Sequence, residues 1–441
     1  MHRFKDIISI MALKGIYYQF VPRFIKNTIS SNRRAFPSQI VFELLEQGKF
    51  CEIHDLWLAY FYKLKTNLPD SFIQKLFVGL KMRDLRYQDH EDITNEILLS
   101  LGSFDAESAD YNTWHELSMA ATSCGLIEVG GRLREMSKNA ALELTQYTKS
   151  GGFIAACNAA LENDNYILAD SIIKGIKSSS FVEEKDVITQ FISFMLTGDN
   201  FDFHDNHSLL FRSYVSGKTV AVVGPNLSEF DNTKEIESFD IIARIGYVGK
   251  NSVPDGGGER TNVSFYAGHK INQIVKGGNL TPLKSLDFIM LKKKRDLDIL
   301  NDLGFSETAL TGSYPLRNAF YLTSPNAVPE ALYNFLVLGA KKVKVFNTTC
   351  FLRPEYPLGY LNNKERYVKS NTYVVPPHSM CFTFGMSHHP LAQFYFYKKM
   401  VHVCKLEGDD FFLKAMGMKS EEYLRELDVV YGLHQWSTYG L

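Results

Sequence analysis

The run Thr219-Val220-Ala221-Val222-Val223-Gly224-Pro225-Asn226 decides the fold of the C-terminal half of this 441-residue chain. Its first five residues are apolar or β-branched and have the length of a strand, which predicts a buried strand. The strand ends in a turn at Gly224, and a helix begins soon after Leu227. Such a strand, glycine turn and helix can present backbone N–H groups to a phosphate. The run therefore indicates a phosphate site, although many such turns bind nothing.

Further short apolar runs follow this strand. They predict strands over residues 240–245, 262–266, 288–291 and 343–346, with a helix over 329–338 before the last strand. Alternating strands and helices predict a mostly parallel, Rossmann-like sheet that helices cover on both faces, with ligands at the carboxyl ends of the strands. The first turn carries neither G-x-G-x-x-G nor a Walker lysine, so NAD, ATP and GTP are not indicated.

Residues 37–205 have apolar side chains at three- and four-residue spacing, which predicts helices. Turns are expected near Gly48, Arg86, Gly125 and Asp164, at steps of 38, 39 and 39 residues. This period is typical of an α-solenoid with one helix pair per repeat; the alternative is a helical bundle without repeats. The composition becomes polar near residue 205, which predicts that the α/β domain spans 206–441.

Composition excludes several classes of protein. The chain has 48 basic and 49 acidic side chains, and this balance argues against a DNA- or RNA-binding protein. The length and a hydrophobic content of 45% predict a globular protein with two or three domains. None of the six cysteines stands at C-x-x-C spacing, which indicates reduced thiols and a cytoplasmic protein.

The N-terminal segment 1–36 is basic and amphipathic, with seven Lys or Arg residues against one acid, Asp6. Such a segment can lie on an anionic membrane face, which predicts a peripheral membrane contact; the alternative is a solvated helix packed on the next domain. The segment lacks the apolar core of a signal peptide, and the chain has no apolar run of about 18 residues that would predict a membrane span.

Six segments lie in this order within residues 218–405: Val220–Leu227, Phe239–Arg244, Gly258–Asn262, Ser324–Val328, Lys342–Phe346 and Phe384–Leu391. Together they resemble the three sialylmotifs of glycosyltransferase family 29, the animal-type sialyltransferases. The family's large motif has a Val-Val-Gly-Asn turn, an Asp-apolar-Arg strand and a final Gly-x-Arg-Thr-Thr. Its small motif has a Ser/Thr-Gly turn, a helix and a Val-x-Val-Tyr strand, and its very small motif has a histidine that Pro-Leu follows in some members.

Some positions depart from the family pattern. Gly246 stands where the family has Asn, Asn326-Ala327 replaces Ser/Thr-Gly, and Gln393 lies in the stretch that carries a Glu. The family's disulfide between the large and small motifs has no counterpart, since no cysteine lies between residues 158 and 349. That loss is expected for a cytosolic, bacterial version, whereas the other departures bear on the identity of the donor.

The resemblance implies a sialyltransferase-like domain that transfers a keto-sugar acid, sialic acid or Kdo, from its CMP donor with inversion. The implied acceptor is a glycan hydroxyl on a bacterial surface polysaccharide or lipooligosaccharide, with the enzyme at the inner membrane face. No metal is expected, because protein groups take over the leaving-group charge.

The resemblance also implies the catalytic residues. His389 matches the motif histidine and would be the general base, because a histidine titrates near neutral pH. His388 is the adjacent competitor, and both alternatively cap or pack a helix. His378 loosely matches the short third motif, whose histidine contacts the donor phosphate; the alternative is a loop histidine.

The donor-binding residues fall in three groups. Gly224, Pro225 and Asn226 would hold the phosphate or ribose through backbone N–H groups and the Asn amide. Ser324, Asn326 and Ala327 precede a helix whose N-terminus suits the donor carboxylate, although Ser and Asn are also ordinary N-cap residues. Arg244 and Arg260 would pair with phosphate or carboxylate, or with Asp240 and Glu259 as structural salt bridges.

Two other functions stay open. Asp296-Leu297-Asp298 follows a predicted strand, as in transferases that hold a metal and a UDP- or GDP-sugar, although leucines at helical spacing favour an exposed helix there. The lost motif positions leave a non-catalytic helical-repeat adaptor with a degenerate nucleotide-binding domain.

Overall fold

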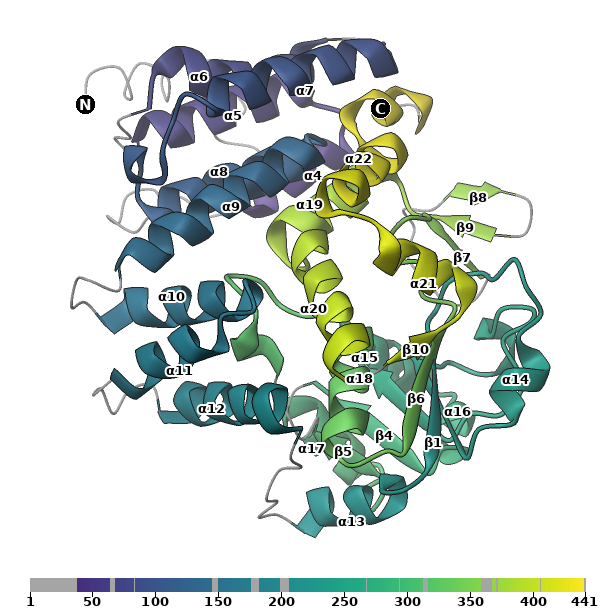
Figure 1. Ribbon diagram of the computed structural model, residues 1–441. Helices are drawn as coiled ribbons and strands as arrows, with labels where there is room; N and C mark the ends of the chain where they lie inside the picture. Colours follow the sequence, from purple (N-terminus) through teal and green to yellow (C-terminus); the bar gives the residue numbers. More distant parts are fainter. Residues whose placement is uncertain are drawn as a thin grey trace. The chain divides into compact units, whose positions relative to one another are not determined.

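The computed structural model has a helical N-terminal region followed by an α/β domain with a parallel, Rossmann-like sheet, as the sequence predicts (Figure 1). The sheet has seven strands. The segment 1–36 and the polar residues 199–205 lie outside the described residues. Among the described helices, none is long and apolar enough to cross a lipid bilayer. The structure describes residues 38–63, 68–82, 84–144, 150–175, 182–198, 206–266, 268–292, 294–311, 316–357, 367–369, 372–404 and 406–439.

The chain forms two compact units. The first consists of Met1–Glu143, Pro376–Ser387 and Leu424–Leu441, and the second of Leu144–Val375 and His388–Tyr423. The described helices of the first unit are α4 (Ser38–Glu46), α5 (Phe50–Lys63), α6 (Asp70–Lys75), η1 (Val78–Lys81), α7 (Tyr87–Leu101), η2 (Ala106–Ser108), α8 (Tyr111–Ser123), α9 (Ile127–Glu143), α19 (Pro377–Met386) and η7 (Leu433–Tyr439). Helix α22 (Ser420–Tyr431) belongs to this unit from Leu424 onward.

The second unit contains the sheet and the helices that precede, connect and follow its strands in the sequence. Its helices are α10 (Ser150–Glu162), α11 (Tyr166–Gly175), α12 (Val182–Thr197), α13 (Asn206–Val215), α14 (Thr233–Glu237), η5 (Lys250–Ser252), α15 (Gly268–Gly277), α16 (Thr281–Lys284), α17 (Lys294–Asp302), η6 (Leu316–Ala319), α18 (Ala327–Val337), α20 (Pro390–Val403) and α21 (Asp410–Gly417). The sequence places the boundary between the helical and the α/β domain at residue 205, whereas the second compact unit begins at Leu144. Helix α12 belongs to this unit because it packs on α18. The ring centroids of Phe191 and Phe194 lie 5.6 and 5.8 Å from that of Tyr333 in α18.

Helical hairpins recur along the first part of the chain, with turns where the sequence predicts them. Gly48, Gly125 and Asp164 lie between α4 and α5, α8 and α9, and α10 and α11, with φ angles of 63°, 80° and 58°. Arg86 directly precedes α7. Each left-handed residue is followed by a backbone N–H that bonds five residues back, the pattern of a Schellman helix end. These bonds, each 2.9 Å long, join Lys49 to Leu44, Leu126 to Ala121 and Asn165 to Ala160.

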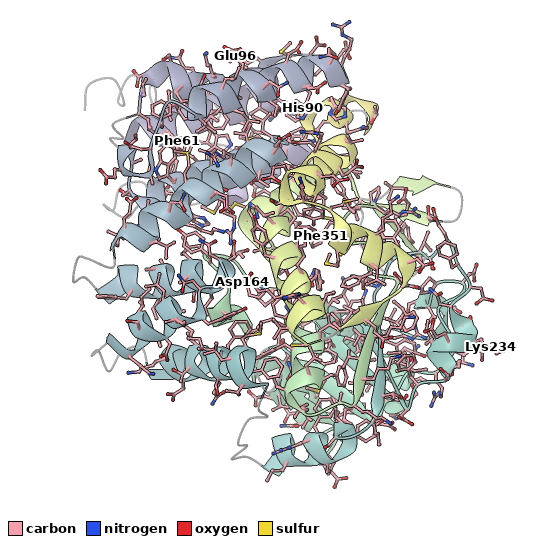
Figure 2. All side chains as sticks on the ribbon, in the orientation of Figure 1. Phe61, His90, Glu96, Asp164, Lys234 and Phe351 are labelled. Atoms are coloured by element: carbon pink, nitrogen blue, oxygen red, sulfur yellow. The ribbon has the colours of Figure 1, made fainter. Side chains whose placement is uncertain are left out.

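A buried carboxylate stabilises the start of α9 in the first unit. The two oxygens of Asp428 accept hydrogen bonds from the N–H groups of Ile127 and Glu128, at 3.0 and 2.8 Å. Asp428 thereby satisfies N–H groups that a helix N-terminus otherwise leaves unpaired. His90 lies in the same cluster, with Nε2 3.4 Å from the carboxylate, and Figure 2 marks its place.

We expect Asp428→Ala to lower the free energy of unfolding by about 2 kcal/mol, because two buried N–H groups lose their acceptor. Urea or thermal unfolding measures the change. Glu426→Ala is the matched control, since Glu426 lies exposed on the same helix. Equal unfolding midpoints for the two variants would show that the cap does not stabilise the unit.

The second unit is organised by a parallel sheet of strand order β10-β6-β1-β2-β3-β4-β5. On one face, Phe335 of α18 packs against Phe265, and Phe211 of α13 against Phe288. On the other face, Ile236 and Phe239 at α14 pack in one buried cluster with residues of β1, β2 and β6. The strands are β1 (Thr219–Val223), β2 (Ile241–Ile245), β3 (Val263–Tyr266), β4 (Phe288–Leu291), β5 (Ala309–Thr311), β6 (Lys342–Phe346) and β10 (Glu407–Gly408).

The predicted strands correspond to β1, β2, β3, β4 and β6, and helices cover both faces, as expected. The sequence did not predict β5 and β10, which are three and two residues long. It also did not predict a small antiparallel sheet formed by β7 (Glu355–Pro357), β9 (Thr372–Val374) and β8 (Tyr367–Lys369). Such short strands are too brief to show a periodic apolar pattern.

Candidate ligand site at the carboxyl edge of the sheet

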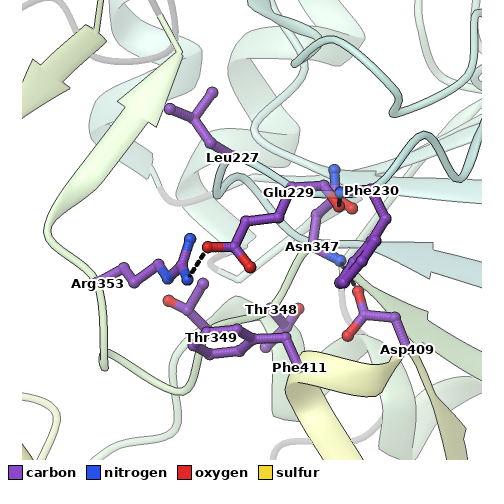
Figure 3. A pocket seen from close by; sticks show the side chains of 10 residues that line it. Leu227, Glu229, Phe230, Asn347, Thr348, Thr349, Arg353, Asp409 and Phe411 are labelled. Atoms are coloured by element: carbon purple, nitrogen blue, oxygen red, sulfur yellow. Dashed lines mark hydrogen bonds and ion pairs between the residues drawn. The ribbon is translucent and has the colours of Figure 1, made fainter.

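The order of the strands reverses between β1 and β6, since β2 to β5 follow β1 on one side and β6 lies on the other. The loops that leave β1 and β6 therefore depart in different directions, and in open α/β sheets ligands bind in the crevice between such loops. A small hollow lies here, bordered by residues 227–230 after β1 and by Asn347, Thr348, Thr349 and Arg353 after β6 (Figure 3). Asp409 and Phe411, which follow β10, complete its wall.

Gly224 lets the two loops approach closely. A Cβ atom at this position would lie 2.4 Å from both the Asn347 carbonyl oxygen and Thr348 Oγ1. The N–H of Gly224 donates to the Phe346 carbonyl at 2.8 Å, and the N–H of Asn226 donates to the Asn347 carbonyl at 3.2 Å. Pro225 has no N–H, so the backbone donors predicted for a phosphate are already used within the protein.

The loop after β6 carries buried polar atoms without partners. Asn347 is 2% exposed, and neither its side-chain nitrogen nor its oxygen has a hydrogen-bond partner in the described structure. The buried Thr349 hydroxyl also lacks one. Both side chains line the hollow. Buried polar groups are nearly always paired, so these groups mark the hollow as a place for a polar ligand.

The backbone of this loop is strained. Asn347, Cys350 and Phe351 have φ angles of 50°, 48° and 66°, in the left-handed region that residues other than glycine rarely adopt. Asp409 holds the loop in place: its carboxylate accepts the N–H of Asn347 at 2.7 Å and the N–H of Phe412 at 2.9 Å. Burial raises the pKa of Asp409 above its ordinary value. Strain of this kind clusters at functional sites.

A second polar cluster lies where the N-termini of α18 and α20 meet. Gln393 joins the two helices, since its oxygen accepts the N–H of Asn326 at 3.0 Å and its nitrogen donates to the Ser324 carbonyl at 3.1 Å. Lys292, the first residue after β4, donates to the Pro325 carbonyl at 3.1 Å, which places the cluster at the carboxyl edge of the sheet. The structure thus brings Ser324, Asn326 and the residues beside them together with α20.

His388 is held as a base in this cluster. Its Nδ1 lies 2.9 Å from the Ser324 carbonyl, which can only accept, so Nδ1 carries the ring proton and the lone pair of the neutral ring lies on Nε2. Burial lowers the pKa of His388, which favours the neutral form. His389 is the N-cap residue directly before α20, is 4% exposed, and donates its backbone N–H to Thr323 Oγ1 at 3.0 Å.

Asn326 and Ala327 occupy ordinary positions at a helix start. The Asn326 side chain accepts the N–H of Val328 at 3.0 Å as the N-cap of α18, and Ala327 is the first helical residue. Lys292 also pairs with Glu330 of the same helix, with 3.1 Å between Nζ and Oε1. Burial raises the pKa of Glu330. Sequence reasoning missed Lys292 and Glu330; their signal was a lysine directly after a buried strand.

The two predicted arginines are mainly structural. Arg244 is 4% exposed and clamps the loop before β3, donating from Nε to Thr261 Oγ1 at 2.9 Å and from Nη2 to the Gly257 carbonyl at 2.6 Å. Burial lowers its pKa to about 10, and Nη1 has no partner in the described structure. Arg260 pairs with Glu237, with Nε 3.0 Å from Oε2.

The predicted salt-bridge partners of these arginines are wrong. Asp240 accepts hydrogen bonds from the N–H and hydroxyl of Thr219 instead. The backbone N–H of Glu259 donates to Glu237, the residue that pairs with Arg260. The reason is that the loop before β3 folds over the end of α14, which brings Glu237 rather than Glu259 to the guanidinium.

His378 belongs to the first compact unit, whereas the other predicted site residues belong to the second. It lies in the first turn of α19 and is 5% exposed, with its ring centroid 6.3 Å from that of Trp436. Burial lowers its pKa to about 4. Its contact with a donor phosphate stays a prediction.

The Asp-x-Asp segment forms the predicted helix, but not a fully exposed one. Asp296 and Asp298 lie in α17, where Asp296 is completely buried and Asp298 exposed. Two carboxylates that point to different environments do not present one face to a metal. In the part of the chain that the structure describes, no group of three or more His, Cys, Asp or Glu residues is placed to hold a metal ion.

No family model matches the chain, and a search of curated proteins found no similar sequence. A functional proposal therefore depends on the fold, the side chains at the sheet edge and the resemblance of short sequence segments to the sialylmotifs.

We expect Gly224→Ala to lower the free energy of unfolding by about 1–3 kcal/mol, because the added methyl group meets the backbone of the β6 loop, which has no room to yield. Ligand binding in the hollow should weaken as the two loops part. Gly277→Ala is the control, since a Cβ there meets nothing within 4 Å. An unchanged unfolding midpoint for Gly224→Ala would contradict the close approach.

Proposed function

We propose that the protein is an inverting glycosyltransferase with a sialyltransferase-like α/β domain. It moves a keto-sugar acid, sialic acid or Kdo, from a CMP donor to a hydroxyl of a glycan, of the kind found on bacterial surface polysaccharide or lipooligosaccharide. The observation that carries the proposal is the pair of partnerless buried side chains, Asn347 and Thr349, at the reversal of the strand order. The sequence resemblance to the sialylmotifs supplies the class of donor.

The nucleotide is proposed to occupy the hollow between the loops after β1 and β6. Asn347 and Thr349 offer a donor and acceptors for the base or ribose, and the rings of Phe230 and Phe411 line the same hollow. Arg244 of β2 lies beside Val223 of β1. Its buried Nη1, which has no hydrogen-bond partner among the described residues, is proposed to bind the donor's phosphate or carboxylate. The loop after β1 is held in place for the nucleotide by its contacts with the loop after β6, at Gly224 and Asn226 on either side of Pro225. Arg260 stabilises the loop before β3 through its ion pair with Glu237.

The sugar is proposed to extend toward the cluster at α18 and α20. β4 lies three strands from β1, about 14 Å at the usual strand spacing, so an extended donor could reach from one centre to the other. Ser324, Asn326 and Ala327 would face the donor carboxylate at the start of α18. His389 is the proposed general base for the acceptor hydroxyl, with His388 beside it in a neutral, proton-accepting form.

The remaining parts of the proposal concern the rest of the chain. The hairpins with matching turns are proposed to form a repeat array that binds the acceptor or a partner protein. The basic segment 1–36 is proposed to hold a cytoplasmic enzyme peripherally at the inner membrane face. Should the hairpins be the only functional part, the protein would be an adaptor that binds no nucleotide.

A nucleotide panel read by thermal shift tests the donor class. We expect CMP and CTP to raise the melting temperature, because a ligand bound only to the folded state stabilises it. UDP and GDP, with and without Mn²⁺, should have no effect, and EDTA should leave the CMP shift unchanged. A shift with UDP that requires Mn²⁺ would favour a metal-dependent transferase, and no shift with any nucleotide would favour the adaptor.

We expect His389→Ala to lower kcat by roughly 10²–10⁴, the usual contribution of a positioned general base, with donor affinity unchanged. Radiolabelled sugar transfer and equilibrium donor binding measure the two quantities. His388→Ala, assayed in parallel, shows which of the adjacent histidines accepts the proton. A folded His389→Ala protein that transfers sugar at the parent rate would remove His389 from the mechanism.

A further inference from the structure

An ion pair bridges the two loops that border the hollow. Arg353, after β6, donates from Nη2 to Glu229 Oε1, after β1, at 2.5 Å (Figure 3). Both residues line the hollow. The two residues are 124 positions apart in the sequence, so the pair links two distant segments of the chain.

Arg353 has two contacts that orient it, and among the described residues only Glu229 accepts a hydrogen bond from its guanidinium. The guanidinium carbon of Arg353 lies 4.6 Å from the centroid of the Phe411 ring, within the range of a cation–π contact that favours this position of the group. Glu229 engages one nitrogen of the guanidinium, and an arginine has five N–H donors in a fork that suits carboxylate or phosphate. The group is therefore oriented for an oxyanion with more than one acceptor oxygen.

Glu229 is the more weakly held member of the pair. Its side chain is 57% exposed, against 32% for Arg353, so water can solvate the carboxylate once it leaves. Exposed ion pairs contribute little to stability, which makes the exchange of one anion for another inexpensive. The hollow also holds the partnerless Asn347 and Thr349, which point to a ligand at this place.

We propose that Glu229 occupies the position of the ligand's phosphate in the empty protein, and that the phosphate displaces it from Arg353 on binding. Arg353 is then the phosphate receptor of the site, and Glu229 is a competing internal anion that selects against weakly charged ligands. This inference rests on the proposed function only for the identity of the nucleoside; the exchange itself requires a phosphate and no particular base.

Calorimetric titration with CMP, cytidine and AMP tests the exchange in the full chain. We expect Glu229→Gln to bind CMP about two- to fivefold more tightly, the range set by the loss of an exposed competing ion pair, and cytidine with unchanged affinity. Arg353→Gln should weaken CMP binding about ten- to hundredfold, which is the usual effect of losing a charge-assisted bond, and should leave cytidine binding unchanged.

The matched control is Glu235→Gln. Glu235 is 48% exposed and pairs with Lys344 at 2.5 Å, so the variant removes the same charge from a similar ion pair that does not line the hollow. Its CMP affinity should equal that of the parent. A gain equal to that of Glu229→Gln would mean that overall charge, not displacement, sets the affinity.

The other outcomes separate this inference from the proposed function. If AMP responds to the Glu229 and Arg353 variants as CMP should, the exchange is supported and the cytidine donor is not. If CMP binds the parent and both variants equally, the exchange is overturned and the CMP donor stands. If no monophosphate binds the parent or Glu229→Gln, both proposals fail.

Discussion

The contact between the end of β1 and the end of β6 determines the shape of the whole carboxyl edge of the sheet. The N–H of Gly224 donates to the Phe346 carbonyl and the N–H of Asn226 to the Asn347 carbonyl, at 2.8 and 3.2 Å. The two loops can approach this closely because Gly224 has no Cβ atom. These bonds bind the two loops together just where the strand order reverses. The loop after β6 therefore has to turn away sharply, and Asn347 adopts a left-handed conformation to do so.

The cost of that sharp turn is offset by anchors from distant parts of the same unit. Left-handed residues other than glycine each cost of order 1–3 kcal/mol. Asp409 accepts the N–H of Asn347, and Tyr423 donates its hydroxyl to the Cys350 carbonyl at 2.8 Å. The Tyr423 ring in turn stacks on Phe394 of α20, with 4.2 Å between centroids. The two-residue strand β10 matters because it delivers Asp409 to this place.

The sequence predicted the sheet because burial on both faces leaves a clear mark in β1, β2, β3, β4 and β6. It also predicts that a ligand binds at the carboxyl ends of the parallel strands, because these ends share one edge of the sheet, and the small hollow lies at that edge. It did not predict which groups are free there. The N–H groups of Gly224 and Asn226 already donate hydrogen bonds to residues 346 and 347, which lie more than one hundred residues away in the sequence. No local pattern records such long-range partners.

Other features of the structure also depend on contacts between distant residues. Leucines at helical spacing located α17, yet the burial of Asp296 depends on its packing in the folded chain. Asn347, Thr349 and Arg353 match no motif, although polar residues directly after the predicted strand at 343–346 were a usable signal. The grouping of α10 to α12 with the sheet follows from aromatic contacts such as those of Tyr333, which composition does not reveal.

The distribution of satisfied and unsatisfied groups decides where a ligand gains binding free energy. A group that is already bonded exchanges one partner for another when a ligand arrives, and the net gain is small. Asn326, Arg260 and the N–H groups around Gly224 are in that position. A buried partnerless group has already lost its water, so a ligand that supplies the missing bond recovers the full desolvation cost. Asn347, Thr349 and Nη1 of Arg244 are such groups, and recognition at this edge of the sheet is therefore expected to depend on them.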